Sequence, residues 1–132
     1  MRSDAAPLDA EFADRLERAC RTAVGDTLRS ITYFTRDGYR QLYLRSDLES
    51  DADLAGFVDL ESDGFRANTA YRGSELGEYR YTVRAFENGY LTRVTAGDRG
   101  VFVTTDGLTI RRSEEVAEAL ARLLADGPAP SD

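Results

Sequence analysis

The first third of the chain changes from one hydrophobic period to another. From Leu8 to Val24 an apolar residue recurs every four positions, the spacing of one face of an α-helix. Acidic residues come early in this segment and Arg18 and Arg21 come late, as the helix dipole favours. Gly25 then predicts its end. The pattern therefore predicts a helix with one buried face.

A β-hairpin is predicted next. Residues 28–34 and 39–44 are rich in β-branched and aromatic side chains, and Asp37-Gly38 lies between them. A two-residue turn at that dipeptide would place Tyr33 opposite Leu42.

A second helix is predicted to begin near Ser46 or Ser50. The sequence from Ser46 to Glu49, SDLE, fits a capping box, and Asp residues follow in what would be the first turn. Its apolar side would consist of Leu54, Phe57 and Val58, with Phe65 as a further candidate. Residues 62–77 contain three glycines and predict no regular element.

Three strands and a last helix complete the pattern. The strands are expected at residues 78–86, 90–96 and 100–105. Asn88-Gly89 is the strongest short hairpin signal in the chain and joins the first two of them. Ser113 is expected to cap the helix, which Gly127-Pro128 would stop.

The resulting order is α-β-β-α-β-β-β-α. Two hairpin blocks separated by a helix predict an α+β fold, with a five-stranded antiparallel sheet and three helices packed on it. A chain of 132 residues is long enough for a single domain, with residues 1–6 and 127–132 expected as flexible tails.

The charge balance favours a particular habitat and disfavours anionic binding partners. All seventeen basic residues are arginine, twenty-four residues are acidic, and the net charge is −7. Selection in molar intracellular salt, where the Debye length is roughly 3 Å, favours such an acidic, lysine-free composition. GC-rich coding bias is the alternative origin of the arginine excess. A net charge of −7 makes nucleic acid or an anionic membrane an unfavourable partner.

The composition also excludes much catalytic chemistry. The chain has no histidine and one cysteine, which removes most metal and haem sites, the Ser-His-Asp and Cys-His machineries, and an internal disulfide. Cys20 lies on the apolar stripe of the first helix and is expected to be a buried small hydrophobe. No apolar run reaches the roughly 18 residues of a membrane helix, so we expect a cytoplasmic protein. From the missing histidines and the single cysteine we expect no catalytic residues, cofactor or metal.

A row of arginines is the most informative chemical feature. With the turn at Asn88-Gly89, Arg84 faces Arg93, and Arg80 lies further along the same side. Like charges directly opposite one another are unfavourable unless an anion lies between them. Three sources remain open: the acidic middle helix of the same chain, that helix in a second copy, or an anionic ligand. The acidic residues concerned are Asp51, Asp53, Asp59 and Glu61.

The order of elements, over roughly residues 8–125, resembles the Roadblock/dynein-light-chain family and its wider profilin-like group. That resemblance implies the strand order 2-1-5-4-3, with the first and last helices on one face and the middle helix on the other. It implies regulators and scaffolds without a catalytic motif. Sensory PAS and GAF domains have a similar sheet with different helices. The lysine-free tract YRGSELGEYRYTVRAFENGYLTRVT is also similar to small haloarchaeal proteins.

The implied strand order places residues 78–86 at an edge of the sheet. This segment is aromatic and contains neither proline nor lysine, the residues that usually block pairing with another chain. The resulting hypothesis is a non-enzymatic interaction or regulatory module that forms a homodimer through this edge and the middle helix. The predicted interface consists of Tyr79, Arg80, Tyr81, Arg84, Phe86, Arg93 and Phe57.

Two alternatives remain. A small-molecule sensor of PAS or GAF type would hold its ligand between the sheet and the middle helix. Its expected lining is Tyr81, Tyr43, Phe57 and Phe65. An arginine-lined nucleic-acid binder would show an affinity that falls steeply with salt.

Overall fold

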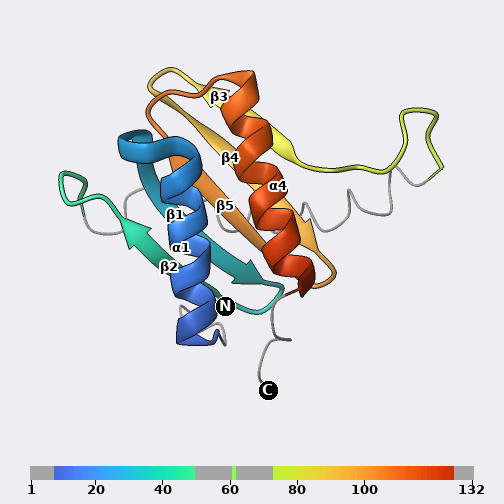
Figure 1. Ribbon diagram of the computed structural model, residues 1–132, viewed down its shortest axis with the longest axis horizontal. Helices are drawn as coiled ribbons and strands as arrows, with labels where there is room; N and C mark the ends of the chain where they lie inside the picture. Colours follow the sequence, from blue (N-terminus) through green and yellow to red (C-terminus); the bar gives the residue numbers. More distant parts are fainter. Residues whose placement is uncertain (1–7, 50–60, 62–72, 127–132) are drawn as a thin grey trace.

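The computed structural model describes residues 8–49, 61 and 73–126. Its elements are α1 (Ala10–Val24), a short 3-10 helix (Gly25–Thr27), β1 (Leu28–Thr35), β2 (Tyr39–Leu44), β3 (Thr82–Phe86), β4 (Gly89–Ala96), β5 (Arg99–Thr105) and α4 (Ile110–Asp126). The five strands form one antiparallel sheet in the order β2-β1-β5-β4-β3. Helices α1 and α4 lie side by side across one face of this sheet (Figure 1).

The first helix forms as the apolar spacing predicts. The Asp9 side chain caps it by accepting a hydrogen bond from the Phe12 backbone N–H at 3.2 Å. Gly25 ends the helix with a φ of 60°, a left-handed conformation that costs a glycine little. The buried side chains are those of the predicted stripe: Phe12, Leu16, Cys20 and Val24.

The main core lies between the two helices and the sheet. Leu16 and Leu120 face it from the helices, and Ile31, Tyr33 and Val103 face it from the sheet, all at most 1% exposed. Burial of these side chains from water is the main force holding the helices on the sheet.

The last helix begins four residues earlier than its sequence predicts. Thr109, and not Ser113, provides the cap, because the Thr109 hydroxyl accepts the Arg112 backbone N–H at 3.1 Å. Ser113 lies within the first turn, where its hydroxyl donates to the Ile110 carbonyl at 2.7 Å. At the other end, the Arg99 guanidinium donates to the Leu124 carbonyl, as the helix dipole favours.

The opposite face of the sheet is more polar. It carries a small apolar cluster of Phe34, Leu91 and Phe102. Beside this cluster the hydroxyls of Ser30 and Thr104 share a hydrogen bond of 2.5 Å, and both residues are buried. Glu61 is also buried, at 1% exposed. Polar groups buried in this way need partners, and those of Glu61 define the candidate site below.

Both hairpin turns lie one residue earlier than predicted. In the first, Phe34 pairs with Tyr39, and Thr35 donates its N–H to the Gly38 carbonyl at 2.8 Å. The turn therefore occupies residues 36–37, and Tyr33 pairs with Arg40 instead of Leu42. In the second hairpin the turn occupies residues 87–88, because Phe86 pairs with Gly89.

Close packing explains why glycine is needed at position 89. A Cβ atom there would lie 2.6 Å from the Thr105 carbonyl oxygen of the neighbouring strand β5. Gly89 is the first residue of β4, and its missing side chain lets β4 and β5 approach one another. The Asn-Gly dipeptide thus marks a close backbone contact between β4 and β5 as well as a neighbouring turn.

The expected number of helices is wrong. The described residues contain two α-helices, α1 and α4, where three were predicted, while the five-stranded antiparallel sheet and the α+β class are as expected. The predicted start at Ser46 is a turn and bend. The Asp47 carboxylate there binds the Arg45 guanidinium at 2.6 Å. Residues 50–60 of that predicted helix and both expected tails lie outside the described residues.

Candidate functional site

Strand β3 is an edge of the sheet, as the resemblance implied. Within the described part of the chain it pairs with β4 only and ends the strand order. Val83 is 40% exposed and Phe86 is 48% exposed, whereas every residue of β5 is buried. The edge therefore presents apolar side chains beside its outer backbone groups.

The edge strand is shorter than predicted. It begins at Thr82 and not at residue 78. The preceding segment is directed toward the helix layer, because Tyr81 packs against the main core and Arg80 pairs with Glu118 of α4 at 3.4 Å. Contacts with Glu118 and with the main core thus replace strand pairing over residues 80–81.

The shifted hairpin register changes which residues face the arginines. Arg84 lies opposite Leu91, and Arg93 lies opposite Thr82. A shift of two residues keeps every side chain on its predicted face, so Arg84 and Arg93 still share the polar face. They lie diagonally across the strand pair instead of directly opposite, which reduces their repulsion.

Glu61 is the anion between these two arginines. Its Oε2 accepts from Arg84 Nε at 2.6 Å, and its Oε1 accepts from Arg93 Nη1 at 2.7 Å. Three sources of negative charge were considered for Arg84 and Arg93. In the structure, a carboxylate of the same chain takes this role. The other acidic residues predicted for this role, Asp51, Asp53 and Asp59, lie outside the described residues.

Two hydroxyl groups complete the cluster. Arg93 Nη2 donates to the Thr82 hydroxyl at 2.7 Å and to the Tyr79 hydroxyl at 2.9 Å, and these two hydroxyls are hydrogen-bonded to each other. Arg93 is 4% exposed, so its charge is buried and compensated by Glu61. Residues 61, 79, 82, 84 and 93 are called the Glu61 cluster below. It fixes β3, β4 and the segment before β3 to one another.

Arg80 does not belong to the Glu61 cluster. Its ion pair with Glu118 is exposed, with 57% of each side chain accessible. Its guanidinium lies 5.7 Å from the centre of the Tyr81 ring. The predicted row of three arginines is therefore split between the two faces of the sheet.

A second ionic network was not predicted. Arg45 donates to Asp106 at 2.5 Å and to Asp47 at 2.6 Å, and Arg29 reaches Asp106 at 3.4 Å. The hydrogen bond from Arg45 lowers the pKa of Asp106, and that of Asp47 in the same way. Arg45 directly follows β2 and Asp106 directly follows β5, two strands that end on the same side of the sheet. The sequence signal that could have predicted this network is an arginine and an aspartate that each directly follow a predicted strand.

Cys20 is buried and is not a reactive thiol. Burial, with a smaller contribution from Glu17, raises its pKa to about 12, so the nucleophilic thiolate is scarce near neutral pH. Among residues 8–49, 61 and 73–126, no group of three His, Cys, Asp or Glu side chains is placed to hold a metal ion. In the same residues, neither helix is long and apolar enough to cross a membrane.

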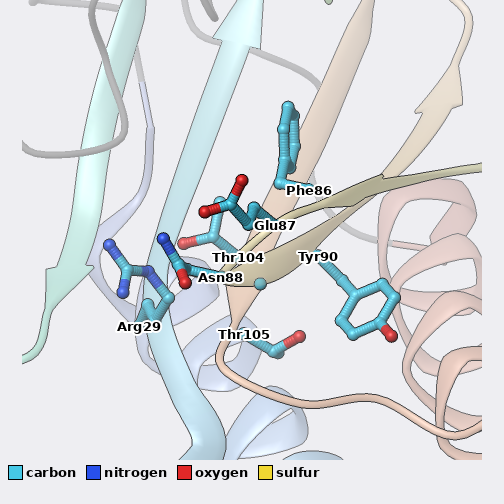
Figure 2. Close-up of a pocket in the computed structure, with 8 residues that line it drawn as sticks. Arg29, Phe86, Glu87, Asn88, Tyr90, Thr104 and Thr105 are labelled. Atoms are coloured by element: carbon cyan, nitrogen blue, oxygen red, sulfur yellow. The ribbon is translucent and has the colours of Figure 1, made fainter.

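A pocket of about 390 Å³ lies at the β3–β4 turn. Arg29, Phe86, Asn88 and Tyr90 are among the residues that line it. Figure 2 shows Arg29 and Asn88 next to each other on one side of the turn, with the Tyr90 ring directed to the other side.

The two described residues of the expected sensory pocket, Tyr43 and Tyr81, lie apart. Tyr43 lies on the β2 edge with the Arg21 guanidinium 4.6 Å from its ring centre, and Tyr81 lies beside the opposite edge. Phe57 and Phe65 lie outside the described residues. The two tyrosines therefore do not share a pocket.

A family model described as a domain of unknown function, DUF7522, matches residues 14–125. The chain belongs to this family. No curated protein matches it.

The DUF7522 chain is similar in fold to solved structures of MglB. One is MglB with a tetrameric arrangement, with a TM-score of 0.62 at 14% identity, covering 94% of this chain and 98% of that one. Another is the gliding protein MglB from Thermus thermophilus, with a TM-score of 0.61 at 17% identity, covering 95% and 99%. Myxococcus xanthus MglB gives 0.57 at 10% identity, covering 95% and 98%. These neighbours have the Roadblock-like fold, which confirms the resemblance at the level of fold.

Proposed function

We propose that this DUF7522 protein is a non-enzymatic interaction and regulatory module that acts as a homodimer through the β3 edge. The observation that carries the proposal is an edge strand with exposed apolar side chains, braced from its own sheet by the buried Glu61 cluster. In the dimer, two β3 strands pair antiparallel, and each adds its backbone hydrogen bonds to a continuous sheet.

The predicted interface residues take different parts in this proposal. Phe86 is exposed beside the seam and makes direct contact with the partner. Arg84 is 36% exposed, so its outer side contacts the second copy while its Nε holds Glu61. Tyr79 and Arg93 act indirectly by keeping β3 in place. Arg80 and Tyr81 flank the seam on the helix side, and Phe57 remains part of the proposed interface.

The fold neighbours support assembly as the mode of action. The solved structure of MglB with a tetrameric arrangement is an assembly of chains with this fold. An edge strand that pairs on one side only among the described residues, with no predicted catalytic set, fits a module that works through protein contacts. We further propose that it works in a salt-rich cytoplasm, where a net charge of −7 on each copy is screened and does not oppose dimer formation.

A pair of lysine variants tests the proposed seam. Val83→Lys adds an edge-blocking charge to the exposed side of β3, and Gln41→Lys adds the same charge to β2, the opposite edge. Sedimentation velocity should show Val83→Lys as a monomer and Gln41→Lys as a dimer. If both variants sediment like the wild-type dimer, the seam lies elsewhere. If Gln41→Lys alone dissociates, the β2 edge forms the interface.

A further inference from the structure

The outer surface of the helix layer has a groove between α1 and α4. Its volume is about 280 Å³, and it is lined by Arg15, Arg18, Ala19, Ala119, Arg122 and Leu123. The three arginines are exposed and form the walls, whereas the two alanines and the leucine are half-buried and form the floor. A small side chain on each helix leaves a hollow with an apolar floor and a basic rim.

The three arginines of the rim have no ion pair among the described residues. Some arginines elsewhere on the surface have one, such as Arg21 with Glu17 and Arg36 with Asp98, whereas Arg40, Arg111 and Arg112 also lack one among the described residues. On α4, Glu118 and Asp126 lie one turn before and one turn after Arg122. Glu118 is engaged by Arg80, and Asp126 has no ion pair among the described residues. On α1, Glu11 and Asp14 each precede a rim arginine by four residues without an ion pair of 4.0 Å or less. The rim differs from Arg40, Arg111 and Arg112 in gathering three unpaired arginines around one hollow, on a chain with a net charge of −7.

We propose that this groove binds an acidic amphipathic helix of a partner protein. Its apolar face would cover the alanine and leucine floor, and its flanking carboxylates would pair with the guanidinium groups on both walls. Arginine suits this role because its planar group forms bidentate pairs with carboxylates. The apolar floor supplies a contribution that salt does not screen.

The groove and the dimer seam are separate surfaces. The groove lies on the outer side of α1 and α4, whereas the seam runs along the β3 edge of the sheet beneath them. Binding to the groove therefore does not depend on the homodimer. The Val83→Lys variant should bind the partner helix as the wild type does, so failure of one proposal is distinguishable from failure of the other.

A designed peptide tests the groove. The probe is a helical peptide of about 15 residues, with leucines at helical spacing and glutamates on both flanks, labelled for fluorescence anisotropy. Its counterpart carries lysine in place of each glutamate. We expect the glutamate peptide to bind and the lysine peptide not to bind. The triple variant R15Q/R18Q/R122Q should weaken binding by about ten-fold, because three exposed ion pairs are lost.

Two further variants separate groove recognition from general charge. R40Q/R111Q/R112Q removes three exposed arginines that also lack an ion pair in the described structure, and it should change binding by less than about two-fold. Ala119→Phe keeps the charge and fills the hollow, and it should abolish binding. Equal losses in both triple variants, full binding by Ala119→Phe, or no binding of the glutamate peptide would overturn the proposal. So would tighter binding of polyglutamate, an RNA oligonucleotide or anionic vesicles through the same arginines.

Discussion

Glu61 carries its charge in a buried position, at 1% exposed. Its compensation in the described structure comes from Arg84 and Arg93, which it binds with separate carboxylate oxygens. Removing one member of such a buried group leaves the remaining charges without a partner, which costs more than the intact pair contributes. The Glu61 cluster is therefore sensitive to substitution at this single position.

Glu61→Gln should lower the free energy of unfolding by about 3 kcal/mol, because the two guanidinium groups lose their counter-charge. Urea denaturation followed by circular dichroism measures the change. Glu118→Gln is the matched control, since it removes the exposed ion pair with Arg80 and should cost less than about 1 kcal/mol. Equal losses for the two variants would show that Glu61 is not a structural counter-ion.

Asp106 should make stability depend on pH in the acid range. The hydrogen bond from Arg45 lowers its pKa in the folded state, so the unfolded chain binds the proton more readily. The contribution of this ion pair is complete above the unfolded pKa of about 4 and is lost as the pH falls through the lower folded value. Melting temperatures between about pH 6 and about pH 2.5 should fall less for Asp106→Asn than for wild type.

The control for this experiment is Asp37→Asn, which removes an exposed acid without an ion pair among the described residues. Its melting profile should follow that of the wild type. If Asp106→Asn and Asp37→Asn give the same profile, the Arg45 network does not contribute to the acid sensitivity.

At the scale of elements, the β3–β4 hairpin depends on its close contact with β5. Gly89→Ala would bring a Cβ atom to 2.6 Å from the Thr105 carbonyl oxygen, which belongs to the backbone and cannot turn away. We expect a loss of about 2 kcal/mol in the free energy of unfolding, as for overpacked sites. Gly107→Ala is the control, because a Cβ there meets no atom within 4 Å. A neutral Gly89→Ala would mean that the hairpin moves freely.

The elements differ in how well the sequence predicts them. The apolar stripe of α1 and the strands β4 and β5 were predicted within a few residues, because burial on one face imposes a regular period. Turn positions were wrong by one residue in both hairpins. At Gly89 the reason is that a glycine signal does not distinguish a turn from a close backbone approach. Of the two predicted starts of the middle helix, Ser46 is wrong, because residues 46–48 form a turn and bend, and Ser50 lies outside the described residues.

At the scale of the whole molecule, the excess of acidic residues should make the fold dependent on salt. Seventeen arginines do not balance twenty-four carboxylates, and their net repulsion grows as screening fades. We expect the melting temperature to rise between about 0.1 M and about 3 M KCl. An equal concentration series of sucrose controls for viscosity and solvent exclusion. A melting temperature that is constant across the KCl series would contradict a halophilic origin of this composition.

The candidate site was predictable in part. The sequence placed Arg84 and Arg93 on one face and named Glu61 among four acidic candidates, because strand alternation survives a register error of two residues. It missed the hydroxyl partners Tyr79 and Thr82 of Arg93, which depend on the path of the segment before β3. Long-range contacts of this kind are set by tertiary packing and have no local signal.

The central claim is that two copies join through β3. Multi-angle light scattering of the wild-type chain, over a hundred-fold range of concentration in about 2 M KCl, measures this directly, since the salt screens repulsion between the acidic copies. We expect a mass of two chains that falls toward one chain on dilution, and a constant single-chain mass for Val83→Lys. A wild-type mass of one chain at every concentration would contradict it.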